Sequence, residues 1–246
     1  MNKLVTLDLW QTIMGEIDLS SFSPSRRQIK CELVYDFLKK LTSKIELSEI
    51  EKSHDFVVAQ IAKYSRFHSD KLFSDWLIIF LKHINKDIFQ QISLEEINTI
   101  GEIIDKAFLD NPPCIFDGTL EFISFCRENN LKIGIISNTG FNSPAAYKQL
   151  LYTNKIYYDT ISLSNELGLA KPDKNIFKFT LDKLNISPSN SIHIGDNPVA
   201  DILGAINFGM DAILISQNNN VKPINNKVFS VIDSINDAKK TLKTWI

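Results

Sequence analysis

Cysteines are scarce in this chain and lie far apart. Three occur among 246 residues, Cys31, Cys114 and Cys126, and none belongs to a Cys-x-x-Cys pair or a Cys/His cluster. Their odd number and wide spacing argue against a disulfide framework and against a structural zinc site. We therefore expect a protein of the reducing cytoplasm.

The sequence also lacks long apolar runs and an excess of charge of one sign. No stretch approaches the roughly 18 apolar residues that span a bilayer, and the chain begins without a cationic leader. With 27 basic and 29 acidic residues, its formal net charge is −2. This balance gives no electrostatic reason to expect nucleic acid or a membrane as a partner. Any anion that binds must be held by local groups.

Short apolar segments alternate with helix-like segments over most of the chain. Runs suited to buried parallel strands occupy residues 4–9, 131–137, 160–163, 191–195, 212–215 and 228–232. Helical periodicity appears between them, at residues 120–128, 176–184 and 199–208, and a closing helix is expected after Ser234 or Asp237. The alternation predicts an α/β fold with a doubly wound parallel sheet.

Residues 20–108 break this alternation. Leu33, Phe37 and Leu41 repeat at the spacing of a helical turn, and the segment holds no convincing strand before Asn111-Pro112-Pro113 marks its end. We predict an all-helical cap at residues 18–110, with about four helices, and a core formed by residues 1–17 and 111–246. An insertion beside the end of the first strand is suited to cover a site there.

Polar residues stand where the predicted strands end. Asp8 follows the first apolar run, Ser137-Asn138 closes the second, and Lys171-Pro172-Asp173 precedes a helix. Gly195-Asp196-Asn197 ends a later run, with Asp201 five residues beyond Asp196. Open α/β sheets place their chemistry at the carboxyl ends of their strands. We therefore expect these groups to meet at one edge of the sheet.

In this order, the motifs resemble those of the haloacid dehalogenase-like (HAD) hydrolases. Asp8 to Thr12 is similar to the nucleophile loop of that family, Ser137-Asn138 to its second motif, Lys171-Pro172-Asp173 to its third, and Gly195 to Asp201 to its fourth. The resemblance covers nearly the whole core. It implies a Rossmann-like core with a helical cap, and Mg²⁺-dependent phosphoryl transfer from a small phosphorylated metabolite through an aspartyl-phosphate at Asp8.

Elementary chemistry explains why such residues suit phosphoryl transfer. A carboxylate nucleophile, here Asp8, divides one difficult displacement into two easier ones. Because two anions must approach each other, the site needs a divalent cation and positive or N–H donors. Asp8, Asp196 and the backbone carbonyl of Trp10 are the expected Mg²⁺ ligands. Lys171 is expected to supply positive charge to the nucleophile and the phosphoryl oxygens.

The remaining candidates are expected to act as donors or as supports. Ser137 offers a hydroxyl and an N–H group, and Asn138 a further donor to the substrate. Trp10 and Thr12 are also expected to contact the substrate, and Thr12 to hold the geometry of the loop. Asp201 is expected to orient Lys171 or a metal-bound water. Alternatively, Ser137 and Asn138 are turn residues after a strand, and Asp201 is an acidic residue in the first turn of a helix without a catalytic role. His193 lies within a predicted strand and is expected to be a packed core residue.

Trp10 departs from the phosphatases that the chain resembles. They typically carry Asp-x-Asp-x-Thr, in which the second aspartate protonates the leaving oxygen, and Trp10 occupies that position here. Indole exchanges no proton near neutral pH, and losing a general acid lowers the rate by about 10²–10⁴.

Three functions therefore remain open. The first is a phosphatase that uses another acid or an activated leaving group. The second is a 2-haloacid dehalogenase, since a halide leaves without a proton and such enzymes usually carry an aromatic residue at this position. The third is a catalytically weak phospholigand-binding or regulatory protein. The segment from Gly195 to Asp201 resembles the Mg²⁺ phosphatase form, which favours the first function.

The sequence does not identify the substrate or the oligomeric state, because selectivity depends on where cap side chains lie. Arg26, Arg27 and Lys30, near the start of the insertion, are suited either to bind a second anionic group or to form a solvated helix face.

Overall fold

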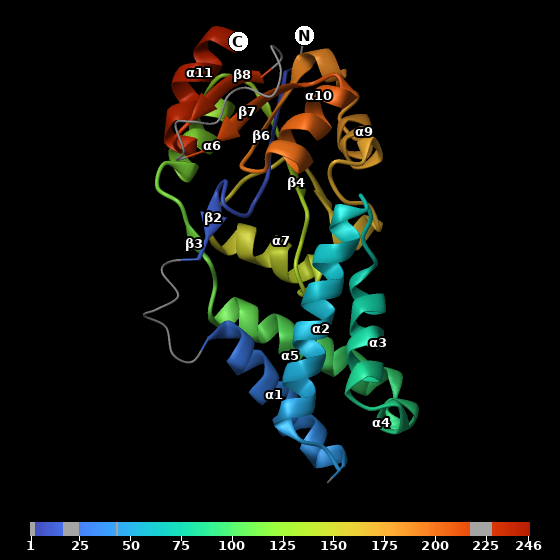
Figure 1. Ribbon diagram of the computed structural model, residues 1–246. Helices are drawn as coiled ribbons and strands as arrows, with labels where there is room; N and C mark the ends of the chain where they lie inside the picture. Colours follow the sequence, from blue (N-terminus) through green and yellow to red (C-terminus); the bar gives the residue numbers. More distant parts are fainter. Residues whose placement is uncertain (1–2, 17–24, 43, 217–227) are drawn as a thin grey trace.

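A six-stranded parallel sheet forms the centre of the molecule (Figure 1). The structure is a computed structural model that describes residues 3–16, 25–42, 44–216 and 228–246. The strand order is β5-β4-β1-β6-β7-β8. The strands are β1 (Leu4–Leu7), β4 (Lys132–Ser137), β5 (Thr160–Leu163), β6 (Ser191–Gly195), β7 (Asp211–Ile215) and β8 (Val228–Ile232). The predicted α/β fold with a doubly wound parallel sheet is confirmed.

Strand β1 lies between β4 and β6, which places Asp8 at the middle of the sheet edge. Leu7 pairs with Ile135 of β4 and with Ile194 of β6. The Asp8 N–H group then donates to the Ile194 carbonyl at 3.0 Å. The strand is shorter than predicted because the chain turns at Leu9, whose carbonyl accepts hydrogen bonds from three following N–H groups.

Helices cover both faces of the sheet. One face packs in a hydrophobic cluster with α6 (Thr119–Glu128), α7 (Pro144–Thr153) and α11 (Ala238–Trp245). The other face packs with α9 (Lys174–Asp182) and α10 (Gly204–Phe208). Shorter elements are α8 (Ser164–Leu167), the 3-10 helices η2 (Pro188–Asn190) and η4 (Ile235–Asp237), and the π-helical turn η3 (Pro198–Leu203). The single helix predicted at residues 199–208 is thus η3 followed by α10.

The segment between β2 (Met14–Gly15) and β3 (Cys114–Ile115) contains five described helices, which we call the helical group. They are α1 (Arg26–Leu41), α2 (Leu47–Arg66), α3 (Phe73–Ile84), α4 (Lys86–Gln91) and α5 (Leu94–Asp110). Figure 1 shows this group beyond the end of the sheet, and its apolar residues form a cluster of their own.

The helical group joins the sheet through a pair of strands that the sequence did not reveal. β2 and β3 pair in antiparallel fashion, Met14 with Ile115 and Gly15 with Cys114. Two-residue strands carry no detectable periodicity, so this pair was not predicted. The last helix of the group ends at Asp110, and the predicted boundary at 17/18 lies outside the described residues. The division into a core and a cap stays a prediction.

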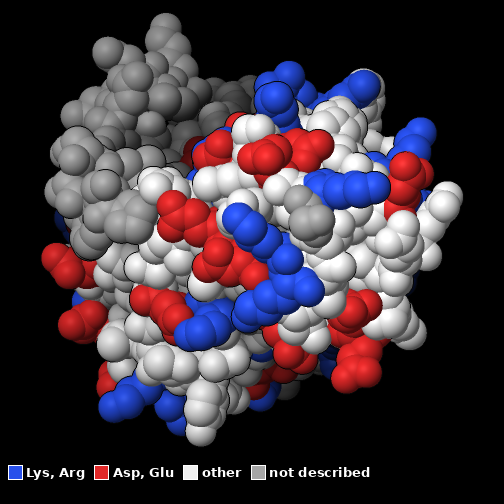
Figure 2. Space-filling model, turned by 90° about the horizontal axis from the view of Figure 1, so that it is seen from below, with Lys and Arg blue, Asp and Glu red and all other residues white. Residues whose placement is uncertain are grey.

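Charges of both signs mix on the outer face of the helical group. Figure 2 shows basic side chains beside acidic ones over this face. Arg27, for example, pairs with Asp55 at 2.7 Å. Among the described residues, no helix combines the length and apolarity needed to cross a membrane.

Candidate active site

The ammonium group of Lys171 lies between two carboxylates at the carboxyl edge of the sheet. Its Nζ donates to Asp8 Oδ1 at 2.7 Å and to the Ile136 carbonyl at 2.6 Å, and it lies 2.5 Å from Asp201 Oδ1. The residue is only 2% exposed. Because a buried charge is very unfavourable without partners, these three oxygens are what allow a lysine here. The lysine in turn fixes the distance between β1 and η3.

Asp201 reaches Lys171 because glycine precedes it at the end of β6. A Cβ atom on Gly195 would lie 2.3 Å from the Asp201 carboxyl carbon. The other carboxylate oxygen, Oδ2, accepts a hydrogen bond from the Asn197 N–H group at 2.8 Å. Asn197 itself caps the first turn of η3. The fourth motif therefore forms a tight loop that directs Asp201 toward the first strand.

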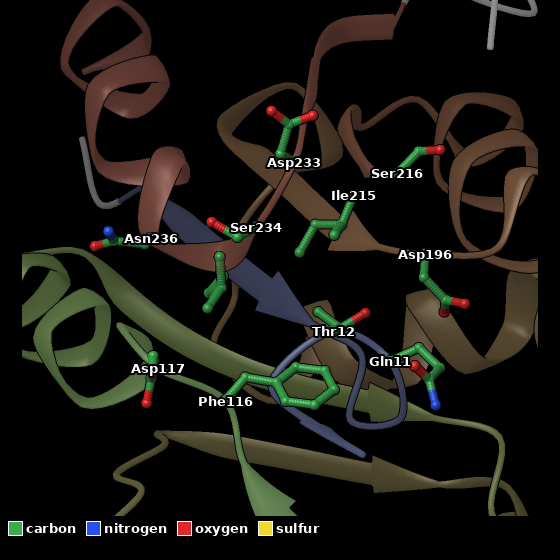
Figure 3. Close-up of a pocket in the computed structure, with 11 residues that line it drawn as sticks. Gln11, Thr12, Phe116, Asp117, Asp196, Ile215, Ser216, Asp233, Ser234 and Asn236 are labelled. Atoms are coloured by element: carbon green, nitrogen blue, oxygen red, sulfur yellow. The ribbon is translucent and has the colours of Figure 1, made fainter. Parts of the chain in front are cut away.

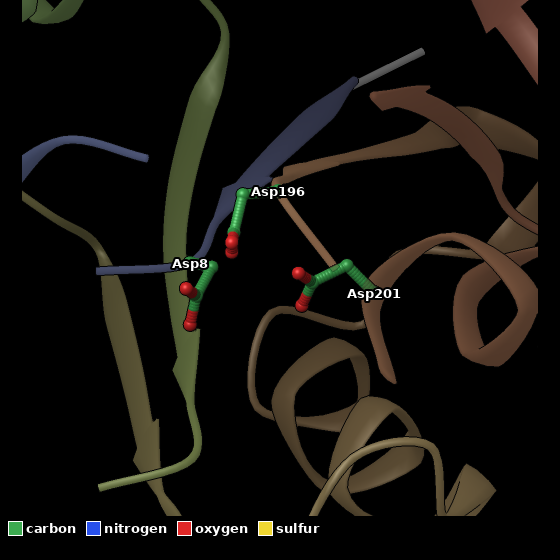
Figure 4. A group of neighbouring side chains, drawn as sticks. All are labelled: Asp8, Asp196 and Asp201. Carbon is green, nitrogen blue, oxygen red and sulfur yellow. The ribbon is translucent and has the colours of Figure 1, made fainter. Parts of the chain in front are cut away.

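Asp8, Asp196 and Asp201 form a group suited to bind a cation. One carboxylate oxygen of each residue lies within 4.8 Å of those of the other two (Figure 4). One ammonium group, that of Lys171, cannot neutralise three carboxylates, so negative charge remains in a largely buried site. Carboxylate oxygens are the ligands that Mg²⁺ prefers. The donor set and its surplus charge therefore fit a divalent cation bound near Asp8 and Asp196.

The pKa values of the three carboxyl groups reflect this surplus of negative charge. Burial, and then the charges of Asp8 and Asp201, raise the pKa of Asp196 to about 7. Burial and repulsion from Asp201 also raise the pKa of Asp8, although Lys171 opposes them. Burial alone would raise the pKa of Asp201, but Lys171 and His193 outweigh it and lower that pKa well below its usual range. Asp201 and Lys171 thus form the stable ion pair. Asp8 and Asp196 carry the remaining negative charge, which a bound cation would neutralise.

The second motif supports both charged partners. Ser137, at the end of β4, hydrogen-bonds to Asp8 and thereby lowers the pKa of this carboxyl group. Asn138 accepts a bond from the Lys171 N–H group at 2.7 Å and donates to the Lys171 carbonyl at 3.0 Å. It also donates to Ser65 Oγ of α2 at 2.9 Å. Asn138 therefore holds the backbone of Lys171, and its contact with a substrate stays a prediction.

The side chain of Trp10 points into the protein. It is half-buried, hydrogen-bonds to the Tyr147 hydroxyl, and lies with its ring centroid 6.5 Å from that of Phe108. The Tyr147 oxygen also accepts a hydrogen bond from the Gly140 N–H group at 3.0 Å. The indole therefore packs the loop after β1 against α5 and α7, and its contact with a substrate stays a prediction. Thr12 is 1% exposed, and its hydroxyl has no hydrogen-bond partner within the described parts of the chain.

A cavity of about 610 Å³ opens beside Asp196 (Figure 3). Its lining comes from the loop after β1, the turn between β3 and α6, the residue that follows β6, the end of β7 with the residue after it, and the segment from the end of β8 into η4. The lining residues are Gln11, Thr12, Phe116, Asp117, Asp196, Ile215, Ser216, Asp233, Ser234, Ile235 and Asn236. Asp196 is thus the member of the acidic group that faces open space, while Asp8 and Asp201 lie deeper.

Phe141, which sequence reasoning missed, joins the loop after β4 to the helical group. It is 4% exposed and belongs to the hydrophobic cluster of that group. Its ring centroid lies 5.3 Å from that of Phe80 and 5.9 Å from that of Phe73. Phe141 follows a polar turn rather than a periodic run, so the sequence carried no signal for this contact. The loop that begins with Asn138 is therefore anchored at both ends.

The three cations at the start of the helical group already have partners. Lys30 is buried and donates to the Phe141 carbonyl at 2.9 Å and to Asn142 at 3.3 Å. Burial lowers the pKa of Lys30 to about 8. Arg26 and Arg27 form ion pairs with Glu16, Glu51 and Asp55. Lys30 therefore belongs to the contact between the helical group and the loop after β4, and not to a solvated face.

Comparison with known proteins agrees with this architecture. The family profile of haloacid dehalogenase-like hydrolases matches residues 3–209. Over 133 residues, the chain is 31% identical to the pyrimidine 5'-nucleotidase YjjG of Escherichia coli and 29% identical to a glyceraldehyde 3-phosphate phosphatase of Methanothermobacter thermautotrophicus. Each alignment covers 52% of this chain and 58% of the relative, so the match spans little more than half of either protein.

Solved structures share the fold over almost the entire chain. A 2-haloacid dehalogenase of Pseudomonas syringae superposes with a TM-score of 0.69, at 20% identity and over 100% of both chains. A HAD phosphatase of Thermococcus onnurineus gives a TM-score of 0.62 at 20% identity, over 98% of this chain and 97% of the other. These likenesses concern the fold alone. The match to the family profile over residues 3–209 shows that the chain belongs to the haloacid dehalogenase-like hydrolases.

Proposed function

We propose that this hydrolase is a Mg²⁺-dependent phosphatase of small phosphorylated metabolites, with Asp8 as its nucleophile. The observation that carries the proposal is the convergence of Asp8, Asp196 and Lys171 at the edge of the sheet. A second carboxylate so close to a carboxylate nucleophile is unfavourable unless a cation binds between them. Displacement of a halide needs no metal, and phosphoryl transfer between two anions does. The acidic group therefore favours the phosphatase.

Each residue has a part in this reaction. Asp8 attacks phosphorus, the leaving oxygen departs, and water then hydrolyses the aspartyl-phosphate. Lys171 and Ser137 donate to Asp8 and stabilise charge on the transferred group. The carboxylates of Asp8 and Asp196 and the Trp10 carbonyl would hold Mg²⁺, which supplies positive charge between nucleophile and phosphate.

The remaining residues act by holding other groups of the site in place. Asp201 keeps Lys171 charged and in place, and Asn138 holds the Lys171 backbone. We assign substrate contacts to Asn138 and to Thr12, whose buried hydroxyl retains its hydrogen-bonding capacity among the described residues. We also propose that residues 18–110 form a cap over this site, because Ser65 of α2 contacts Asn138 beside Lys171. The cytoplasm remains the expected location.

Trp10 restricts the leaving groups that this site can release. Its indole N–H group bonds to Tyr147 and offers no acid to a leaving oxygen. We therefore propose acyl or aryl phosphates, whose leaving groups need little protonation, as the best substrates. The named activities of the relatives, a nucleotidase and a glyceraldehyde 3-phosphate phosphatase, support a small phosphorylated substrate.

The aromatic residue at position 10 also supports a second candidate, a 2-haloacid dehalogenase that releases halide without a metal. A third candidate, a regulatory protein that binds a phosphorylated ligand without turnover, is favoured by the same missing acid. The three candidates differ in what they release, so one set of assays separates them.

The test measures phosphate release from acetyl phosphate and p-nitrophenyl phosphate, with Mg²⁺ or with EDTA. We expect activity that requires Mg²⁺ and disappears in Asp8→Asn but persists in the control Asp182→Asn, whose carboxylate lies on the exposed face of α9. Halide release from 2-chloropropionate in EDTA would establish the dehalogenase instead. Binding of a phosphorylated ligand by calorimetry, with no product after long incubation, would establish the regulatory protein.

A further inference from the structure

A chain of buried hydrogen bonds runs behind the proposed active site. His193 lies in β6 directly opposite Thr6 of β1, and its Nδ1 is 2.8 Å from the Thr6 hydroxyl. Its Nε2 is 3.2 Å from Asp201 Oδ1, the oxygen that lies 2.5 Å from Lys171 Nζ. Both Thr6 and His193 have no exposed surface. The bonds therefore connect the middle of the sheet to the lysine that contacts Asp8.

The partners of His193 determine which of its nitrogens carries the proton. An ionised carboxylate such as Asp201 only accepts hydrogen bonds, so the nitrogen that faces it must be protonated. Burial lowers the pKa of His193, which keeps the ring neutral and leaves Nδ1 without a proton. The Thr6 hydroxyl must then donate to Nδ1. This bond, at 2.8 Å, is shorter than the alternative from the same hydroxyl to the Ile192 carbonyl at 3.3 Å.

We infer that Thr6 and His193 act as positioning residues: Thr6 donates to Nδ1 and so orients the His193 ring in its Nε2–H form, and His193 holds Asp201 toward Lys171 and Asp8. The inference rests on the proposed function and deepens it. Neither residue contacts the acidic oxygens of Asp8 or Asp196 in this structure. They act through Asp201, in the way that a carboxylate behind a catalytic histidine fixes its tautomer and orientation.

The surroundings of the ring support a role in orientation. Phe177 of α9 packs edge-on against His193, with ring centroids 5.5 Å apart and an interplanar angle of 89°. Asn197 holds the second oxygen of Asp201. The imidazole can therefore neither rotate freely nor exchange its partner for water. Without the bond from Nε2, Asp201 Oδ1 would lose one of its two described partners in a buried site.

The test compares near-isosteric pairs of variants in the phosphatase assay. His193→Gln retains an N–H donor close to the position of Nε2, and His193→Met removes it. Thr6→Ser retains the hydroxyl, and Thr6→Val removes it. We expect the variants H193M and T6V to lose about 10–100-fold in kcat, as when an outer-shell partner is removed. KM should stay close to the wild-type value, because neither residue contacts the substrate.

The conservative variants H193Q and T6S should keep most of the wild-type kcat. Equal losses of kcat in H193Q and H193M would overturn the inference, since packing alone would then account for the effect of His193. An unchanged kcat in both H193M and T6V would also overturn it, since neither hydrogen bond would then affect activity. Melting temperatures of all four variants, measured in parallel, distinguish unfolding of the protein from displacement of Asp201 in a folded protein.

A spectroscopic measurement tests the tautomer without relying on activity. Nitrogen-15 NMR of histidine-labelled protein should show His193 as the neutral Nε2–H form in wild type and in D8N, with Nδ1 shifted in T6V. An Nδ1–H form or an imidazolium in wild type would overturn the inference. If wild type hydrolyses no phosphate ester, the proposed function fails, and this spectrum still decides whether His193 donates to Asp201 from Nε2 and accepts from Thr6 at Nδ1.

Discussion

Replacing Lys171 by methionine should destabilise the fold more at pH 8 than at pH 5. The substitution keeps an unbranched side chain of similar length and removes the ammonium group that contacts Asp8 and Asp201. Both carboxylates are buried, at 6% and 1% exposure. Breaking a buried ion pair by removing one partner costs about 3–5 kcal/mol, because the other charge remains desolvated. We expect that loss at pH 8 in EDTA.

The dependence on pH follows from the carboxyl groups. In wild type, the pKa of Asp201 is lowered in the folded state, so its contribution to stability is present above the unfolded pKa and is lost only in acid. Between pH 8 and 5 this contribution stays constant. In the variant, burial without Lys171 raises the folded pKa of Asp201 and raises that of Asp8 further. The ionised carboxylates of Asp8 and Asp201 then destabilise the folded variant most at high pH. This destabilisation decreases as both groups take up protons.

Urea denaturation at the two pH values measures this difference. The difference in free energy of unfolding between wild type and K171M should be smaller at pH 5 than at pH 8, by more than about 1 kcal/mol. The matched control is Lys178→Met, since Lys178 pairs with Asp182 at about 60% exposure. This control should change stability by less than about 0.5 kcal/mol at either pH. A gap between K171M and wild type that is small, or equal at both pH values, would refute the reasoning.

Two further substitutions test other parts of the structure. Trp10→Asp should raise kcat on alkyl phosphates more than on aryl phosphates, because the new carboxyl group supplies the missing acid. Equal or lower activity on both substrates would show that the bond from the indole to Tyr147 contributes more to activity than a general acid does. Phe141→Ala should lower the free energy of unfolding by about 3–5 kcal/mol, since it leaves a cavity in the cluster of the helical group, and urea titration against the exposed control Phe179→Ala checks this. A loss for Phe141→Ala no larger than that of the control would show that the loop after β4 is not anchored there.

Several elements were predictable because their signals are local. The apolar runs of β4 to β7 and the helical periodicity of α6 and α9 gave bounds within two residues of those observed. The parallel arrangement followed from the alternation of strands and helices. The strand pair β2–β3 and helix α7 were not predicted. β2 and β3 are too short for periodicity, and α7 follows a loop whose capping residue, Ser143, resembles the turn residues before it.

The roles of single side chains were less predictable. Lys30 looked like an exposed cation on a helix, yet it is buried against the Phe141 carbonyl. His193 was expected to be a core residue; it is fully buried, and it also bonds to both Thr6 and Asp201. Such contacts join residues that are remote in sequence, and no local pattern reports them.

The sequence by itself determined that polar groups would stand at strand ends and that these ends would share an edge, since parallel strands carry their carboxyl ends to the same side. Only the tertiary structure decided which of them touch. The order β4-β1-β6 places Asp8 between the second and fourth motifs, and the closeness of Gly195 to Asp201 lets one lysine reach two carboxylates. Hydrogen bonds of about 3 Å depend on strand register and loop geometry, which are set by the packing of the whole chain.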